Sequence, residues 1–183
     1  MQLADVCMDV ASSSSAVFLS LVFLRALLHK IGDHAALNGT IREYRVMPDR
    51  MAPLAGNAVV VGEACTSIGL MLPQTRTASA LLACSLLLVY TVAIAINLRR
   101  GRTRIDCGCG GAGQGISGLH VVRNVVLALC AVPAMAFVGS GPTSFWISAV
   151  TAGCVLVLWF MFLAFDQLLG NRAHATATEY SFL

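Results

Sequence analysis

The chain has 183 residues, of which 57% are hydrophobic and only 11% carry a charge. Soluble globular domains have about 25% charged residues, and a mean hydropathy of +0.79 leaves too few polar side chains to cover a water-facing surface. This composition excludes an ordinary soluble enzyme, a disordered tail and a nucleic-acid-binding protein. The seven cysteines do not indicate a secreted disulfide scaffold, because most of them lie inside apolar segments.

Five long apolar segments predict an all-α fold, a polytopic membrane bundle with about five transmembrane helices. Each segment has the roughly 18 to 25 residues that a helix needs to cross about 30 Å of hydrocarbon. The alternation of polarity typical of barrel strands is not visible, and helices pair their backbone groups within one segment. The segments are Ala11–Leu28, Met51–Leu72, Ala78–Leu98, Leu119–Val138 and Phe145–Leu169.

The first segment is diluted by four serines at positions 12–15 and has a cleaved signal peptide as its alternative. The preceding residues contain two aspartates and no Lys or Arg, and no small-residue cleavage site follows Leu28. We therefore expect a retained helix. Residues 1–172 are expected to form one membrane domain, followed by a short tail at 173–183.

Basic residues cluster in the first and third connections between the segments. With five spans, these connections share a face with the C-terminus, and this face carries nine basic residues against one on the other. The positive-inside rule places this face in the cytoplasm and the N-terminus outside. The nine residues are Lys30, Arg42, Arg45, Arg50, Arg99, Arg100, Arg102, Arg104 and Arg172.

A Cys-Gly-Cys sequence lies in a glycine-rich connection after the third segment. The intervening glycine permits a tight turn, so Cys107 and Cys109 can approach disulfide range, and a small, strained ring is readily exchanged. Upstream arginines favour the thiolate that exchange requires, whereas the adjacent aspartate opposes it. The pattern predicts a redox dithiol supported by Asp106, Gly108, Arg100 and Arg102.

Two other interpretations of this pair stay open. A closed metal site needs about four ligands, and His120 is the nearby candidate beyond the two thiols. The pair can also be an ordinary couple of loop cysteines. Four further cysteines lie inside the apolar segments, where packing is the first interpretation and a second dithiol the alternative; they are Cys65, Cys84, Cys130 and Cys154.

Charged residues inside the segments need partners, because an isolated charge in hydrocarbon is costly. Glu63 lies near the middle of the second segment, and we expect Arg25 or Arg123 to pair with it. The pair either pins two helices together or lines a polar pocket that holds a quinone headgroup or relays protons. Asp166 is expected to be solvated at a membrane edge, and Lys30 to extend into the interface.

The order of these features resembles the methylamine utilisation protein MauE family over about Leu19 to Leu129. The resemblance runs from Arg25–Lys30 through Tyr44–Pro48, Glu63–Leu70 and Tyr90 to Arg123-Asn124. Its most specific part is the Arg100-Gly101-Arg102 triplet before the Cys-Gly-Cys-Gly-Gly sequence. Proteins of the DoxX and vitamin K epoxide reductase types have a similar four-helix core.

The resemblance implies a multi-pass protein of the bacterial inner membrane that helps to process, export or mature the small subunit of methylamine dehydrogenase. It implies a thioredoxin-like partner of the MauD type and membrane lipid around the bundle, and an accessory factor more than an independent enzyme. The alternative is a quinone-linked thiol–disulfide oxidoreductase with another exported client. Work on an exported subunit needs thiols outside the cytoplasm, whereas the charge count places Cys107 and Cys109 inside it.

Overall fold

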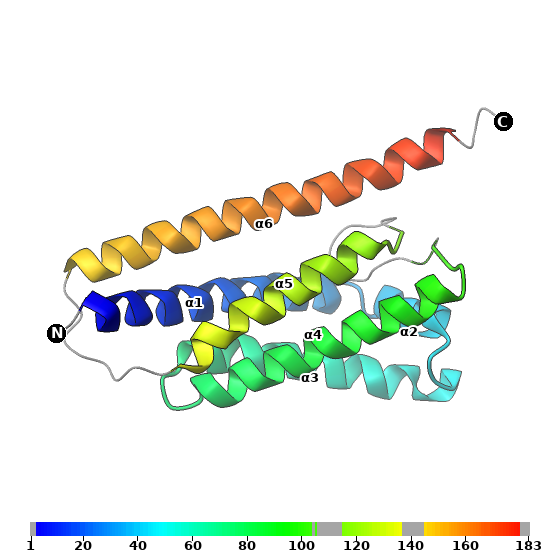
Figure 1. The fold of residues 1–183 in the computed structure, drawn as a ribbon. Coiled ribbons are helices and arrows are strands. Elements are labelled where there is room, and N and C mark those ends of the chain that lie inside the picture. Colours follow the sequence, from blue (N-terminus) through cyan, green and yellow to red (C-terminus); the bar gives the residue numbers. More distant parts are fainter. Residues whose placement is uncertain (1–2, 104, 106–114, 137–144, 180–183) are drawn as a thin grey trace.

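The computed structural model describes residues 3–103, 105, 115–136 and 145–179, with side chains described as far as residue 171 (Figure 1). These ranges contain helices and no strand. The elements are α1 (Leu3–Gly32), α2 (His34–Tyr44), the short 3-10 helix η1 (Asp49–Met51), α3 (Ala52–Met71), α4 (Arg76–Arg99), α5 (Gly118–Met135) and α6 (Phe145–Glu179).

Five of the described helices, all except α2 and η1, are long and apolar enough to cross a membrane. This finding confirms the predicted all-α membrane bundle. The serine run lies inside α1, where Ser12, Ser14 and Ser15 are buried against neighbouring helices. Serine hydroxyls are tolerated inside a membrane helix when they face other helices rather than lipid.

Helix α2 was not predicted from the sequence. It lies between the first two spans and buries one side chain, Leu37. Its N-terminus is capped by Asp33, whose carboxylate accepts a hydrogen bond from the backbone N–H of Ala36 at 2.8 Å. It ends at Arg45, which has a left-handed backbone with φ of 45°.

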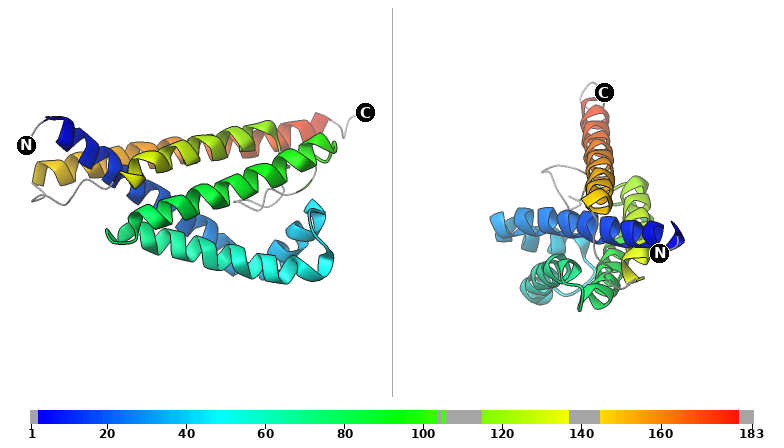
Figure 2. Two further views of the ribbon diagram at one scale, coloured as in Figure 1. Left: turned by 60° about the horizontal axis from the view of Figure 1, so that its bottom comes forward. Right: turned by 90° about the vertical axis from the view of Figure 1, so that its left-hand side faces the viewer.

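Helices α1, α3, α4 and α5 form a closed four-helix core. α1 packs on α3 and α5, and α4 packs on the same two helices from the other side. α6 lies outside this ring and packs on α1 (Figures 1 and 2). Half of the large apolar side chains described in α6 are exposed, among them Trp146, Phe160 and Met161, as expected for a helix that faces lipid.

Close approach of α3 to its neighbours depends on small residues. Ser20 of α1 and Ser67 of α3 donate hydrogen bonds to each other's backbone carbonyls, at 2.8 and 3.1 Å. At Gly69 of α3, an added Cβ would overlap the side chain of Ser79 in α4. Without a hydrophobic drive between helices in lipid, such contacts determine how closely helices pack.

We therefore expect Gly69→Ala to destabilise the bundle by about 1 to 3 kcal/mol, because the added methyl group forces α3 and α4 apart. Gly62→Ala is the matched control in the same helix, since its Cβ would meet Leu86 at an ordinary 3.4 Å. Thermal unfolding of the purified protein in detergent measures the difference. Equal melting temperatures for the two variants would contradict the close contact.

Candidate functional site: a buried charge network

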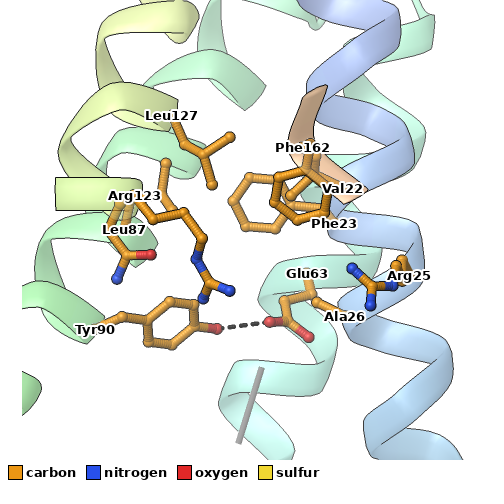
Figure 3. Close-up of a pocket in the computed structure, with 11 residues that line it drawn as sticks. Val22, Phe23, Arg25, Ala26, Glu63, Leu87, Tyr90, Arg123, Leu127 and Phe162 are labelled. Carbon is orange, nitrogen blue, oxygen red and sulfur yellow. Dashed lines mark hydrogen bonds between the residues drawn. The ribbon is translucent and has the colours of Figure 1, made fainter. Parts of the chain in front are cut away.

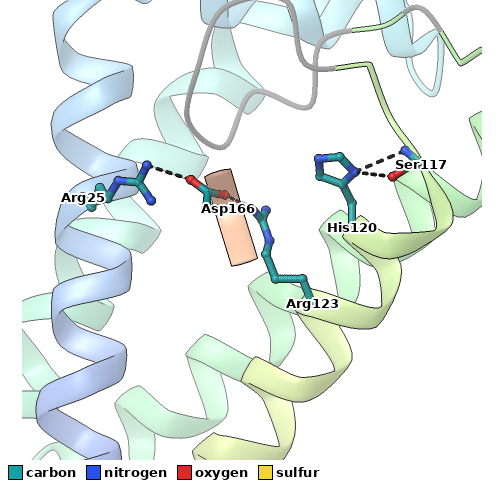
Figure 4. A network of polar contacts seen from close by, with 5 residues as sticks. All are labelled: Arg25, Ser117, His120, Arg123 and Asp166. Atoms are coloured by element: carbon teal, nitrogen blue, oxygen red, sulfur yellow. Dashed lines mark hydrogen bonds and ion pairs between the residues drawn. The ribbon is translucent and has the colours of Figure 1, made fainter. Parts of the chain in front are cut away.

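An aspartate from the outermost helix lies between two arginines of the core (Figure 4). Asp166 of α6 accepts hydrogen bonds from Arg25 of α1 at 2.7 Å and from Arg123 of α5 at 2.9 Å. Asp166 is 4% exposed and Arg123 is 7% exposed. These contacts connect three helices through two charge-assisted hydrogen bonds, which are the stronger class of hydrogen bond.

A second network joins the other two core helices to α1. Glu63 of α3 is fully buried, and one of its oxygens accepts hydrogen bonds from Lys30 of α1 at 2.6 Å and from Tyr90 of α4 at 2.8 Å. The Lys30 ammonium also lies 5.6 Å from the centre of the Tyr90 ring, a cation–π distance. The network therefore fixes α1, α3 and α4 to one another.

Two expectations about these charges were wrong, and a third stays a prediction. Glu63 was expected to pair with Arg25 or Arg123; its ion pair here is with Lys30, and both arginines bind Asp166. Asp166 was expected to be solvated, yet α6 lies against α1 and buries it. Lys30 was expected to extend into the interface, but it is 5% exposed and turns inward to Glu63.

A small pocket lies between the two networks (Figure 3). Polar side chains from four helices line it, namely Arg25, Glu63, Tyr90, Arg123 and Asn124. Its free volume is about 30 Å³, which is enough for one or two water molecules. A cavity that holds a benzene ring has about 150 Å³. The pocket as the side chains stand therefore does not fit a quinone ring, and the quinone of the sequence prediction remains a hypothesis.

The Cys-Gly-Cys sequence falls in residues 106–114, so Asp106, Cys107, Gly108 and Cys109 lie outside the described residues. Both ends of that segment are described. Ile116 donates a backbone hydrogen bond to the carbonyl of Ile105 at 3.0 Å. Ile105 and Ile116 are buried in one apolar cluster with Ile94 of α4. The two ends of the segment are therefore held together at the end of the bundle.

The predicted supporting arginines lie directly after α4. Arg100 donates from Nη1 to the carbonyl of Arg45 at 3.1 Å, and Arg102 donates to the carbonyl of Glu43 at 3.5 Å. Both acceptors are at the C-terminal end of α2, where carbonyls lack helical partners. These arginines therefore tie α2 to the end of α4, and their effect on the thiols stays a prediction.

His120, the nearby candidate ligand in the metal interpretation, has a structural contact. It is buried in the first turn of α5, and its Nδ1 accepts a hydrogen bond from the backbone N–H of Ser117 at 3.2 Å. The Ser117 hydroxyl lies 3.0 Å from the same nitrogen. This reciprocal cap fixes the start of α5.

Comparisons with known proteins identify the family of this chain. The family model for methylamine utilisation protein MauE matches residues 8–138. The chain is 36% identical over 168 residues to methylamine utilization protein MauE of Paracoccus denitrificans, with 89% of each chain covered. The chain belongs to the MauE family. No solved structure matches it.

The MauE match contains both cysteines of the motif and four of the membrane-capable helices, with α1 included from residue 8 onward, whereas α6 begins after it. Asp166 is thus a contact from outside the matched range. The sequence contained a signal for this contact, namely the similar depth of the three charged residues in their helices. Arg25 and Arg123 lie about 10 and 8 Å from the ends of α1 and α5 at the same end of the bundle, and Asp166 approaches that end in the fifth span.

We expect Glu63→Gln to destabilise the protein by about 3 to 5 kcal/mol, because it leaves the Lys30 ammonium buried without a countercharge. Adding Lys30→Met to Glu63→Gln should restore much of the loss, because it removes the unpaired charge. Melting temperatures in detergent for the single and double variants form the test. A Glu63→Gln protein as stable as the original would contradict a charged pair.

Asp166→Asn should loosen the C-terminal half of α6 selectively, because it removes the countercharge of Arg25 and Arg123. Hydrogen exchange in residues 160–171 measures this loosening against exchange in α3. Gln167→Leu is the control, since Gln167 is exposed next to Asp166. Unchanged exchange in α6 of the Asp166→Asn protein would show that other contacts hold this helix.

Proposed function

We propose that this MauE-family protein is a membrane accessory factor in methylamine utilisation that helps to mature the small subunit of methylamine dehydrogenase through a Cys107–Cys109 redox dithiol. The observation that carries the proposal is the paired ends of the cysteine-bearing segment. The Ile105–Ile116 hydrogen bond holds together the two ends of a short segment at the bundle end, and the sequence of this segment includes both thiols. Family membership supports the methylamine setting.

The chemistry proposed for this segment is thiol–disulfide exchange. A thiolate of the client attacks the Cys107–Cys109 disulfide, and the resulting mixed disulfide is resolved by a second client thiol. The client loses two electrons and two protons and gains one disulfide, while Cys107 and Cys109 become thiols. A disulfide on a thioredoxin-like partner of the MauD type then accepts the two electrons and restores the bridge.

The buried charge network has a supporting role in this proposal. Arg25, Lys30 and Arg123 lie in the half of the bundle where α1 and α4 end and α5 begins. Their contacts join α1 to α3, α5 and α6. A rigid end of the bundle holds the base of the cysteine-bearing segment in one position, where an exchange partner can reach it. No electron transfer through the network is needed, because sulfur exchange requires direct contact between the two partners.

The proposed setting is the bacterial inner membrane, where the five membrane-capable helices cross the bilayer. An enzyme subunit that is exported passes this membrane during its maturation. The same placement brings the protein beside a membrane-anchored or exported thioredoxin-like partner. The quinone-linked alternative has less support, because the described pocket has room for water only.

Replacing either motif cysteine should abolish maturation without removing the protein from the membrane. In methylamine-grown cells, Cys107→Ser and Cys109→Ser should each reduce methylamine dehydrogenase activity to the level of a deletion strain, because an exchange cycle needs both sulfurs. Thiol trapping of the small subunit should show reduced or mispaired cysteines. Cys65→Ser is the matched control, since Cys65 is an exposed cysteine on α3.

Normal enzyme activity in both single variants would remove the redox role. Labelling with a membrane-impermeant thiol reagent tests which side of the membrane the two cysteines face. Labelling of Cys107 and Cys109 in intact spheroplasts supports direct exchange with an exported subunit. Labelling only after the membrane is permeabilised would contradict direct exchange and agree with the charge count.

A further inference from the structure

An open hollow of about 440 Å³ lies where α2 ends beside the residues that follow α4. It shares no lining residue with the pocket between the buried charge networks. Figure 1 shows α2 and the last turns of α4 at the same end of the bundle. The residues that line the hollow are Glu43, Arg45, Gly101, Arg102, Thr103 and Ile105.

The charge around this hollow is strongly positive. Residues 42–50 and 99–102 contain six arginines and two acidic residues, a net charge of +4. Two of the arginines, Arg45 and Arg102, line the hollow against the single carboxylate of Glu43. A compact positive surface of this kind attracts an anion, and its attraction extends over about one Debye length.

The arginines retain hydrogen-bond donors for such an anion. A guanidinium has five N–H groups, and the described side-chain contact of Arg102 uses one of them on the Glu43 carbonyl. Arg45 contributes its backbone carbonyl to Arg100, so this contact leaves the Arg45 guanidinium uncommitted. Arginine donors in a planar fork match the oxygens of a phosphate group.

The hollow lies at the depth of lipid headgroups. α1 ends at Gly32, α3 begins at Ala52 and α4 ends at Arg99, so three membrane-capable helices leave the hydrocarbon at this end. Exposed apolar side chains accompany the arginines here, namely Val46, Met47, Met51 and Leu54. Basic residues beside exposed apolar ones are typical of segments that lie in a membrane interface.

We propose that this hollow binds the phosphate headgroup of an anionic phospholipid, with Arg45 and Arg102 as its ligands. A lipid fits better than an acidic protein segment, because the site combines a positively charged hollow with apolar side chains at the membrane boundary. The positive-inside rule predicts that this end faces the cytoplasm, where the leaflet surface is anionic. The lipid site needs no redox change of the cysteines.

The test uses the full-length protein purified in a neutral detergent. Phosphatidylglycerol should raise the melting temperature in a concentration-dependent way and appear as a bound lipid in native mass spectra, whereas phosphatidylcholine should not. The Arg45→Gln, Arg102→Gln double variant should lose about thirtyfold in apparent affinity, since each basic residue near an anionic surface contributes about a factor of five. Arg45→Gln alone should lose about fivefold.

Arg42→Gln, Arg50→Gln is the matched control, because it removes the same charge from the same end but outside the hollow. Retained affinity in this control supports the site, and an equal loss would overturn it in favour of diffuse surface charge. Equal binding of phosphatidylglycerol and phosphatidylcholine would also overturn it. Stabilisation reproduced by inorganic phosphate would identify a free anion as the ligand, and Arg45-dependent binding of a glutamate-rich peptide without lipid binding would identify a protein partner.

Discussion

A charged side chain that is buried in hydrocarbon needs an oppositely charged partner, and this constraint organises the bundle. Among the residues that the structure describes, four charged side chains are buried, and each belongs to an ion pair. A broken pair leaves an uncompensated charge that costs several kcal/mol, whereas lipid packing alone gives membrane helices little preference for one another. The two networks therefore help to define which helices meet, and Asp166 holds α6 against the core together with Phe162, which packs on Phe18.

The consequence for function is a rigid end of the bundle. The charge pairs lie in the same half as the apolar cluster of Ile94, Ile105 and Ile116, from which the cysteine-bearing segment extends. The chain enters and leaves that segment at two hydrogen-bonded isoleucines. The sequence between these isoleucines contains the Cys-Gly-Cys motif, so this anchored base sets where the segment begins and ends.

The arginines at this end serve several physical roles at once. By the positive-inside rule their charge predicts the orientation in the membrane, and two of them, Arg100 and Arg102, satisfy carbonyls at the end of α2. That contact converts a loop between two spans into a helix packed beside the core. It also gathers positive charge around a hollow at the membrane boundary, which is why a lipid headgroup is the ligand proposed for it.

The sequence by itself determined the number and type of the spans, because helix length and hydrocarbon thickness fix that result without knowledge of packing. It also identified Arg25, Glu63 and Arg123 as charges that need partners, and the motif that places the chain in its family. Only the tertiary structure decided the pairing. Lys30 becomes the partner of Glu63, and Asp166 becomes the partner of Arg25 and Arg123. Both pairings depend on the rotation and depth of α1 and α6, and local hydropathy encodes neither variable. Helix α2 likewise depends on tertiary contacts, since a helix of 11 residues is marginal on its own and Arg100 and Arg102 satisfy carbonyls at its C-terminal end.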